Sequence, residues 1–70
     1  MISFKPFFLN ISLEDISTYS LIKKYNISSS TINRLRHDKP VSTETINKLC
    51  EILKCDISDV AEYIADKGKS

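Results

Sequence analysis

The sequence contains one glycine, two prolines and no tryptophan, and it lacks a long apolar run. The single glycine, Gly68, lies near the C-terminal end, so sharp turns elsewhere must use other residue types. No apolar stretch approaches the roughly 20 residues that a membrane-spanning helix needs, and the N-terminus lacks the basic, apolar and small-residue order of a secretory signal. We therefore expect a cytoplasmic protein with no membrane partner.

Residues that carry metal or catalytic chemistry are also scarce. Cys50 and Cys55 are the only cysteines and His37 is the only histidine, so a four-ligand zinc site would have to recruit carboxylates. We predict structural thiols, no metal and no cofactor. With no glycine loop and no paired carboxylates beside a nucleophile, we expect no enzyme. We also expect no small-molecule effector site, because the chain is predicted to form one domain.

The composition is typical of one small globular domain, with 41% apolar and 27% charged residues in a chain of 70. We expect the domain to span residues 1–66, followed by a frayed polar tail at 67–70. The formal net charge of +1 hides two segments of opposite sign. Residues 18–40 carry a net charge of +4, whereas residues 41–66 carry −4. A basic segment of this kind can orient a protein toward a polyanion.

The spacing of apolar residues predicts an all-α fold of five short helices and no strand. In chain order, the helices begin near Lys5 and after the N-caps Ser17, Ser28, Ser42 and Asp56. The last helix is predicted because four apolar side chains recur at the i, i+3, i+4, i+7 spacing of a buried stripe. These side chains are Ile57, Val60, Ala61 and Ile64.

Turns between these helices have to form without glycine. Asp15, Asn26 and Asp38 stand at the three junctions between predicted helices in the first half of the chain. Asn and Asp are the non-glycine residues that enter the left-handed backbone region most easily. We predict that these three residues end helices there.

Two of the predicted helices, within Ser17–Arg36, are joined by a turn of about three residues, as in a helix-turn-helix. Apolar residues of both helices and of the turn can meet in a wedge that fixes the angle between them. The wedge residues are Leu21, Ile22, Ile27, Ile32 and Leu35. The opposite side of the second of these helices carries a polar stripe at the same helical spacing. The stripe consists of Ser30, Asn33, Arg34 and His37.

The pattern I-S-x-x-x-L-I-x-K-x-N-I-S-S-S-T-I-x-x-L over Ile16–Leu35 resembles the Cro/C1-type, or xenobiotic-response-element, family of bacterial and phage DNA-binding regulators. The following PVSTETINKLCEILKCDISDVAEYI is similar to the fourth and fifth helices of small single-domain members. The likeness runs ungapped from about Ile2 to Ile64. It implies a compact, lambda-repressor-like five-helix domain whose helix-turn-helix comprises the second and third helices.

The resemblance also implies a sequence-specific transcriptional regulator, a repressor that binds a palindromic double-stranded DNA operator as a homodimer. In this family the third helix enters the major groove. Carried over to this chain, the base-contacting residues are Ser29, Ser30, Asn33 and Arg34. Asn33 and Arg34 are the main specificity residues, because Asn can bond adenine and Arg can bond guanine through two hydrogen bonds each.

Phosphates are bound by cations, by hydroxyls and by the free N–H groups at helix starts. The residues predicted to contact them are Thr18, Tyr19, Thr31, Arg36, Lys39, Ser42 and Thr43.

Alternatives stay open at this point. Serines and threonines at a helix start often serve only as caps, and Lys23, Lys24 and His37 fit a solvated surface. Tyr63 fits either the edge of the core or a dimer contact in the C-terminal segment. A rival function is a protein-interaction module on the same fold, such as an antirepressor, antitoxin or phage-encoded inhibitor. The low net charge and the acidic C-terminal half favour this rival.

Overall fold

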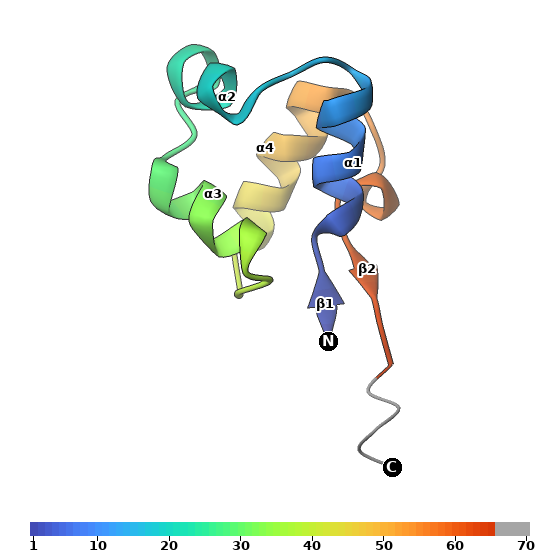
Figure 1. Ribbon diagram of the computed structural model, residues 1–70. Helices are drawn as coiled ribbons and strands as arrows, with labels where there is room; N and C mark the ends of the chain where they lie inside the picture. The colour runs from blue at the N-terminus through green and yellow to red at the C-terminus, as the bar shows by residue number, and fades with distance from the viewer. Residues whose placement is uncertain (66–70) are drawn as a thin grey trace.

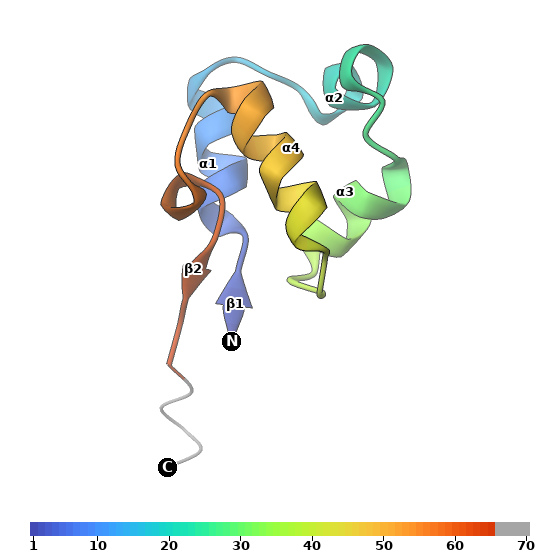
Figure 2. The same cartoon turned by 180° about the vertical axis from the view of Figure 1, so that it is seen from behind.

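The computed structural model describes residues 1–65, which form four α-helices, one turn of 3-10 helix and a two-stranded antiparallel sheet. The elements, in chain order, are β1 (Ile2–Ser3), α1 (Lys5–Leu13), α2 (Thr18–Tyr25), α3 (Ser29–Arg36), α4 (Thr43–Leu53), η1 (Ile57–Asp59) and β2 (Glu62–Tyr63). In both ribbon views α4 lies between α3 and α1, and β1 and β2 lie side by side at one end (Figures 1 and 2). The tail expected at 67–70 lies outside the described residues.

One apolar core joins all four helices to the C-terminal segment. Its buried members are Phe4, Phe7, Ile11, Leu21, Ile27, Ile32, Leu35, Leu49 and Val60. The predicted wedge of the helix-turn-helix is part of this core, because Leu21, Ile27, Ile32 and Leu35 are buried and Ile22 packs against them half-buried. The angle between α2 and α3 is therefore held by side chains that water does not reach.

The three serine N-caps predicted for α2, α3 and α4 are confirmed. The Ser17 hydroxyl accepts a hydrogen bond from the Ser20 N–H at 3.1 Å. Ser28 and Ser42 accept in the same way from the N–H groups three residues on, at 3.1 and 3.2 Å. Each cap satisfies one of the backbone donors that the first turn of a helix leaves without a partner.

The predicted left-handed residues are confirmed as well. Asp15, Asn26 and Asp38 have φ angles of 58°, 61° and 54°. A fourth residue, Lys54, has φ 53° and ends α4. Its place at the helix end agrees with the sequence, which favours a cation there, but its left-handed conformation was not predicted. Lysine has no special preference for this region, so its place there comes from the path of the chain between α4 and η1.

Lys54→Gly is expected to raise the free energy of unfolding by about 0.5–1 kcal/mol, because glycine enters the left-handed region without a steric cost. Lys48→Gly is the matched control, since Lys48 is exposed in the interior of α4. There the same change should lower stability by about 1 kcal/mol. Thermal unfolding followed by circular dichroism measures both. Equal destabilisation by the two variants would contradict the assignment of Lys54.

The predicted fifth helix and the predicted absence of strands are wrong. Between α4 and residue 65, helical structure is limited to η1, whose N-cap Asp56 makes no side-chain capping bond. Of the expected buried stripe, Val60 is buried and Ala61 half-buried, but Ile57 and Ile64 are exposed.

Backbone pairing with the N-terminal segment replaces the fifth helix. β2 pairs with β1 in the register Ile2 opposite Tyr63 and Ser3 opposite Glu62. The Ile64 N–H extends the pairing by donating to the Met1 carbonyl at 2.8 Å. Backbone N–H and C=O groups that bond β1 are not available for the hydrogen bonds of a helix over the same residues.

Candidate nucleic-acid interface

The outer face of α3 carries the four residues that the sequence predicts to contact bases. Ser29, Ser30, Asn33 and Arg34 are all exposed, whereas Ile32 and Leu35 of the same helix are buried. No hydrogen bond within residues 1–65 engages the Asn33 amide or the Arg34 guanidinium. Both groups are therefore free to bond a ligand, on a helix whose other face is fixed by the core.

The hydroxyl groups at the start of α3 are partly engaged with each other. Ser28 Oγ lies 2.8 Å from Thr31 Oγ1 and 3.2 Å from Ser30 Oγ, besides accepting from the Thr31 N–H. Thr31 is half-buried in this network. The capping interpretation of the serine and threonine run therefore holds for Ser28 and Thr31, while the exposed Ser29 side chain is outside the network.

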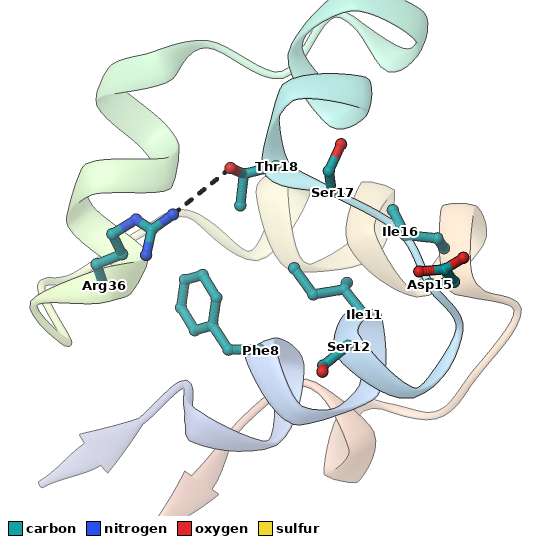
Figure 3. A pocket seen from close by; sticks show the side chains of 8 residues that line it. All are labelled: Phe8, Ile11, Ser12, Asp15, Ile16, Ser17, Thr18 and Arg36. Atoms are coloured by element: carbon teal, nitrogen blue, oxygen red, sulfur yellow. Dashed lines mark hydrogen bonds between the residues drawn. The ribbon is translucent and has the colours of Figure 1, made fainter.

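Arg36, at the end of α3, lies against the first two helices (Figure 3). Its Nη2 donates to Thr18 Oγ1 at 3.5 Å, and its guanidinium carbon lies 5.3 Å from the centroid of the Phe8 ring. Phe8 thus supports Arg36 by a cation–π contact from α1. Two residues predicted to contact phosphate, from different helices, are brought together at the N-terminus of α2.

This meeting point borders an open hollow of about 400 Å³ between α1, α2 and the end of α3. The first N–H groups of α2 and the Arg36 guanidinium are both positive in character, so an anion placed between them would be attracted by both. The Asp15 carboxylate also lines the hollow, but at the end away from Arg36 (Figure 3). The arrangement at Thr18 and Arg36 can therefore hold phosphate oxygens.

The other predicted phosphate contacts lie on three elements. Tyr19 in the first turn of α2 is exposed, with the Lys23 ammonium 5.7 Å above its ring. Lys39 is exposed in the loop between α3 and α4, and its N–H donates to the Arg34 carbonyl at 2.8 Å. The Ser42 hydroxyl is occupied as the cap of α4, whereas Thr43 is exposed beside it.

A residue that the sequence did not indicate as an anchor fixes this loop. The Asp38 carboxylate accepts a hydrogen bond from the Phe4 N–H at 2.9 Å. This bond ties the loop that carries Lys39 to the start of α1. No local pattern could have revealed it, because the two residues are 34 positions apart in sequence.

Within residues 1–65, no three or more His, Cys, Asp or Glu side chains are grouped so that they could hold a metal ion. None of the helices described here has the length and apolar character needed to cross a membrane.

Comparison with known proteins identifies the class to which this helix-turn-helix belongs. A family model for the Cro/C1-type HTH DNA-binding domain matches residues 10–66, which is most of the chain. The chain therefore belongs to the Cro/C1-type helix-turn-helix family, and the resemblance noted in the sequence is confirmed. The all-α helix-turn-helix class is confirmed with it, although with four helices instead of five.

Among solved structures, the crystal structure of the transcriptional regulator VanUg, form II, is similar to this chain. The TM-score is 0.84 at 25% sequence identity, and the alignment covers 93% of this chain and 87% of that chain. The chain matches no curated protein sequence.

Proposed function

We propose that the protein is a sequence-specific transcriptional regulator, a repressor that reads the major groove with α3 as a homodimer. The observation that carries this proposal is the pair of unengaged side chains, Asn33 and Arg34, on the exposed face of a core-anchored helix. A rigid helix that presents free bidentate donors is what base recognition in the major groove requires.

The charge distribution supports a single orientation on DNA. Residues 18–40, which include α3, have a net charge of +4, and residues 41–66 have −4. Contacts of Arg36 and Thr18 with one phosphate group, and of Lys39 and Thr43 with others, would position α3 without reading the sequence. The acidic residues at and after the C-terminal end of α4, Glu51, Asp56, Asp59 and Glu62, would then lie away from the phosphate contacts at the start of α4.

A homodimer is proposed because one short helix reads only a few base pairs, and two linked helices increase both site length and affinity. Apolar side chains of the C-terminal segment support association there, since Ile57 and Tyr63 are 60% and 72% exposed. Tyr63 is thus not at the edge of the core, which leaves a dimer contact as its proposed role. A compact DNA-binding domain represses most simply by occupying an operator and excluding other proteins from it.

A salt titration of DNA binding, with the stoichiometry measured by analytical ultracentrifugation, tests this proposal. If each protomer neutralises three to four phosphates, the logarithm of affinity should fall with the logarithm of salt concentration with a slope of roughly −5 to −7 for the dimer. A slope near zero, or no binding to any duplex at low salt, would contradict DNA as the target and favour a protein partner.

Arg36→Ala is expected to weaken binding by a similar factor for every duplex sequence and to reduce the magnitude of the salt slope by about 1 per protomer. The reason is that a phosphate contact contributes affinity but no base discrimination. Lys24→Ala is the control, because it removes one exposed charge from α2 outside the proposed interface. An Arg36→Ala loss confined to one operator sequence would assign Arg36 to base reading instead.

A further inference from the structure

The two cysteines lie together where α4 ends. The Cys55 N–H donates to the Cys50 carbonyl at 3.1 Å, and the N–H of the left-handed residue Lys54 donates to the same carbonyl. An N–H to carbonyl bond between residues five positions apart is typical of a helix C-terminus, and it brings the side chains of the two bonded residues close together. Cys50 and Cys55 occupy those two positions, so the backbone itself pairs their thiols.

Both thiols are half-buried, and they border an open hollow of about 510 Å³. The other residues around this hollow are Glu51, Lys54, Asp56 and Asp59. Burial, in the first place, raises the pKa of the Cys55 thiol, and the neighbouring Cys50 and Asp59 add to the increase. The Cys50 side chain thus affects the Cys55 thiol directly. The two thiols are neighbours, and reagents can approach them from the hollow.

Two neighbouring thiols suit disulfide formation better than metal binding. Glu51, Asp56 and Asp59 border the same hollow, but within the described part of the chain no carboxylate joins the two thiols in a group that could hold a metal ion. Two thiols that the end of a helix holds as neighbours need only side-chain rotations to reach the S–S bond length of a disulfide.

We propose that Cys50 and Cys55 are a site of reversible oxidation, closing to an intrachain disulfide by exchange with a low-molecular-weight disulfide. One protein thiolate attacks a sulfur of the small disulfide, whose S–S bond breaks and releases one small thiolate. The second protein thiolate then attacks the protein sulfur of the mixed disulfide and releases the other. Two protein thiols are oxidised and one small disulfide is reduced to two thiols, which take up the two protons.

The proposed disulfide forms at the C-terminal end of α4, whereas the proposed DNA contacts of this helix lie at its N-terminal end. The 11 residues of α4 span about 16 Å, and this length separates the cysteine end of the helix from Ser42 and Thr43. The disulfide should therefore raise the melting temperature by several degrees without altering the exposed face of α3. Because the thiolate is the attacking species, closure is expected to be slow near neutral pH and faster in alkaline buffer.

The test equilibrates the full chain with mixtures of reduced and oxidised glutathione, quenches with acid, and analyses intact mass and thiol content. The expected product is a monomer that has lost two hydrogens and carries no glutathione. The variants Cys50→Ser and Cys55→Ser should stop at the mixed disulfide with one glutathione. Persistent mixed disulfides, disulfide-linked dimers or unreacted thiols in the native chain would overturn the proposal.

A second measurement separates folded-state geometry from mere proximity in sequence. The same titration in denaturing urea should require an oxidised-glutathione fraction roughly tenfold or more higher for half closure, because the unfolded chain does not hold the two thiols together. Equal or easier closure in urea would show that the native helix end does not favour the disulfide, and this would overturn the proposal even if the disulfide forms.

Discussion

Replacing Asn33 and Arg34 together by alanine is expected to remove the preference of the protein for its operator over unrelated duplexes. Each bidentate contact with the correct base discriminates by roughly 1–3 kcal/mol, so the two together correspond to a loss of at least about 30-fold in specific affinity. Residual binding should remain, because the groups proposed to contact phosphate are unchanged. Titration of operator and random duplexes, in the same salt, measures the difference.

The double variant should keep its fold, since both side chains are exposed and neither makes a hydrogen bond within the described residues. Its melting temperature is therefore expected to stay within a few degrees of the parent. Lys24→Ala with Asn47→Ala is the matched control, because it removes one cation and one amide from exposed positions of α2 and α4. Equal loss of operator affinity in the two double variants would contradict base reading by α3.

Leu35→Ala is expected to lower the free energy of unfolding by about 3–5 kcal/mol. The Leu35 side chain is 0% exposed and lies on the face of α3 that packs into the core. Truncation of a fully buried leucine removes its apolar contacts and leaves a cavity. The total free energy of unfolding of a domain this small is only a few kcal/mol larger than this cost. We expect a fall of at least roughly 15 °C in melting temperature. Thermal unfolding by circular dichroism or calorimetry measures it.

The same substitution at Leu13 supplies the control. Leu13 is the last residue of α1 and is 73% exposed, so Leu13→Ala should change stability by no more than about 0.5 kcal/mol. Leu35→Ala should lose DNA binding together with its fold, whereas the Asn33 and Arg34 variant should lose recognition with its fold intact. Similar melting temperatures for Leu35→Ala and Leu13→Ala would contradict the description of the core.

The parts of the fold that depend on neighbours in sequence could be predicted from the sequence. A serine before a helix satisfies donors two or three residues on, and Asn26 reaches its left-handed conformation from the local preference of its own side chain. The helix-turn-helix follows from the same kind of information, because its wedge and its polar stripe both arise from helical spacing within Ser17–Arg36.

The parts that depend on distant residues could not be predicted. The stripe from Ile57 to Ile64 has helical spacing, but pairing with β1, about 60 positions earlier, decides its structure. The hydrogen bond from the Phe4 N–H to Asp38 and the contact of Arg36 with Phe8 also join residues that are far apart in sequence. The left-handed Lys54 is a further case, because lysine gives no signal for that conformation.

For the proposed interface, the spacing predicted which side of α3 is exposed, and the structure agrees for Ser29, Ser30, Asn33 and Arg34. The sequence predicted Ser42 as the cap of α4, but it did not predict that Thr31 is engaged in the cap network of α3, or that Arg36 lies against α1 and α2. Contact of these residues with DNA stays a prediction. Arg36 is the strongest of the phosphate candidates, because its guanidinium lies beside Thr18 and the N-terminus of α2.

Selection of bound duplexes from a random pool shows whether α3 reads DNA sequence as part of a symmetric dimer. We expect a two-fold symmetric consensus whose half-sites lie about 10 base pairs apart and contain guanine and adenine where Arg34 and Asn33 reach them. Repeated selection that enriches no sequence, or only sequences without symmetry, would contradict it.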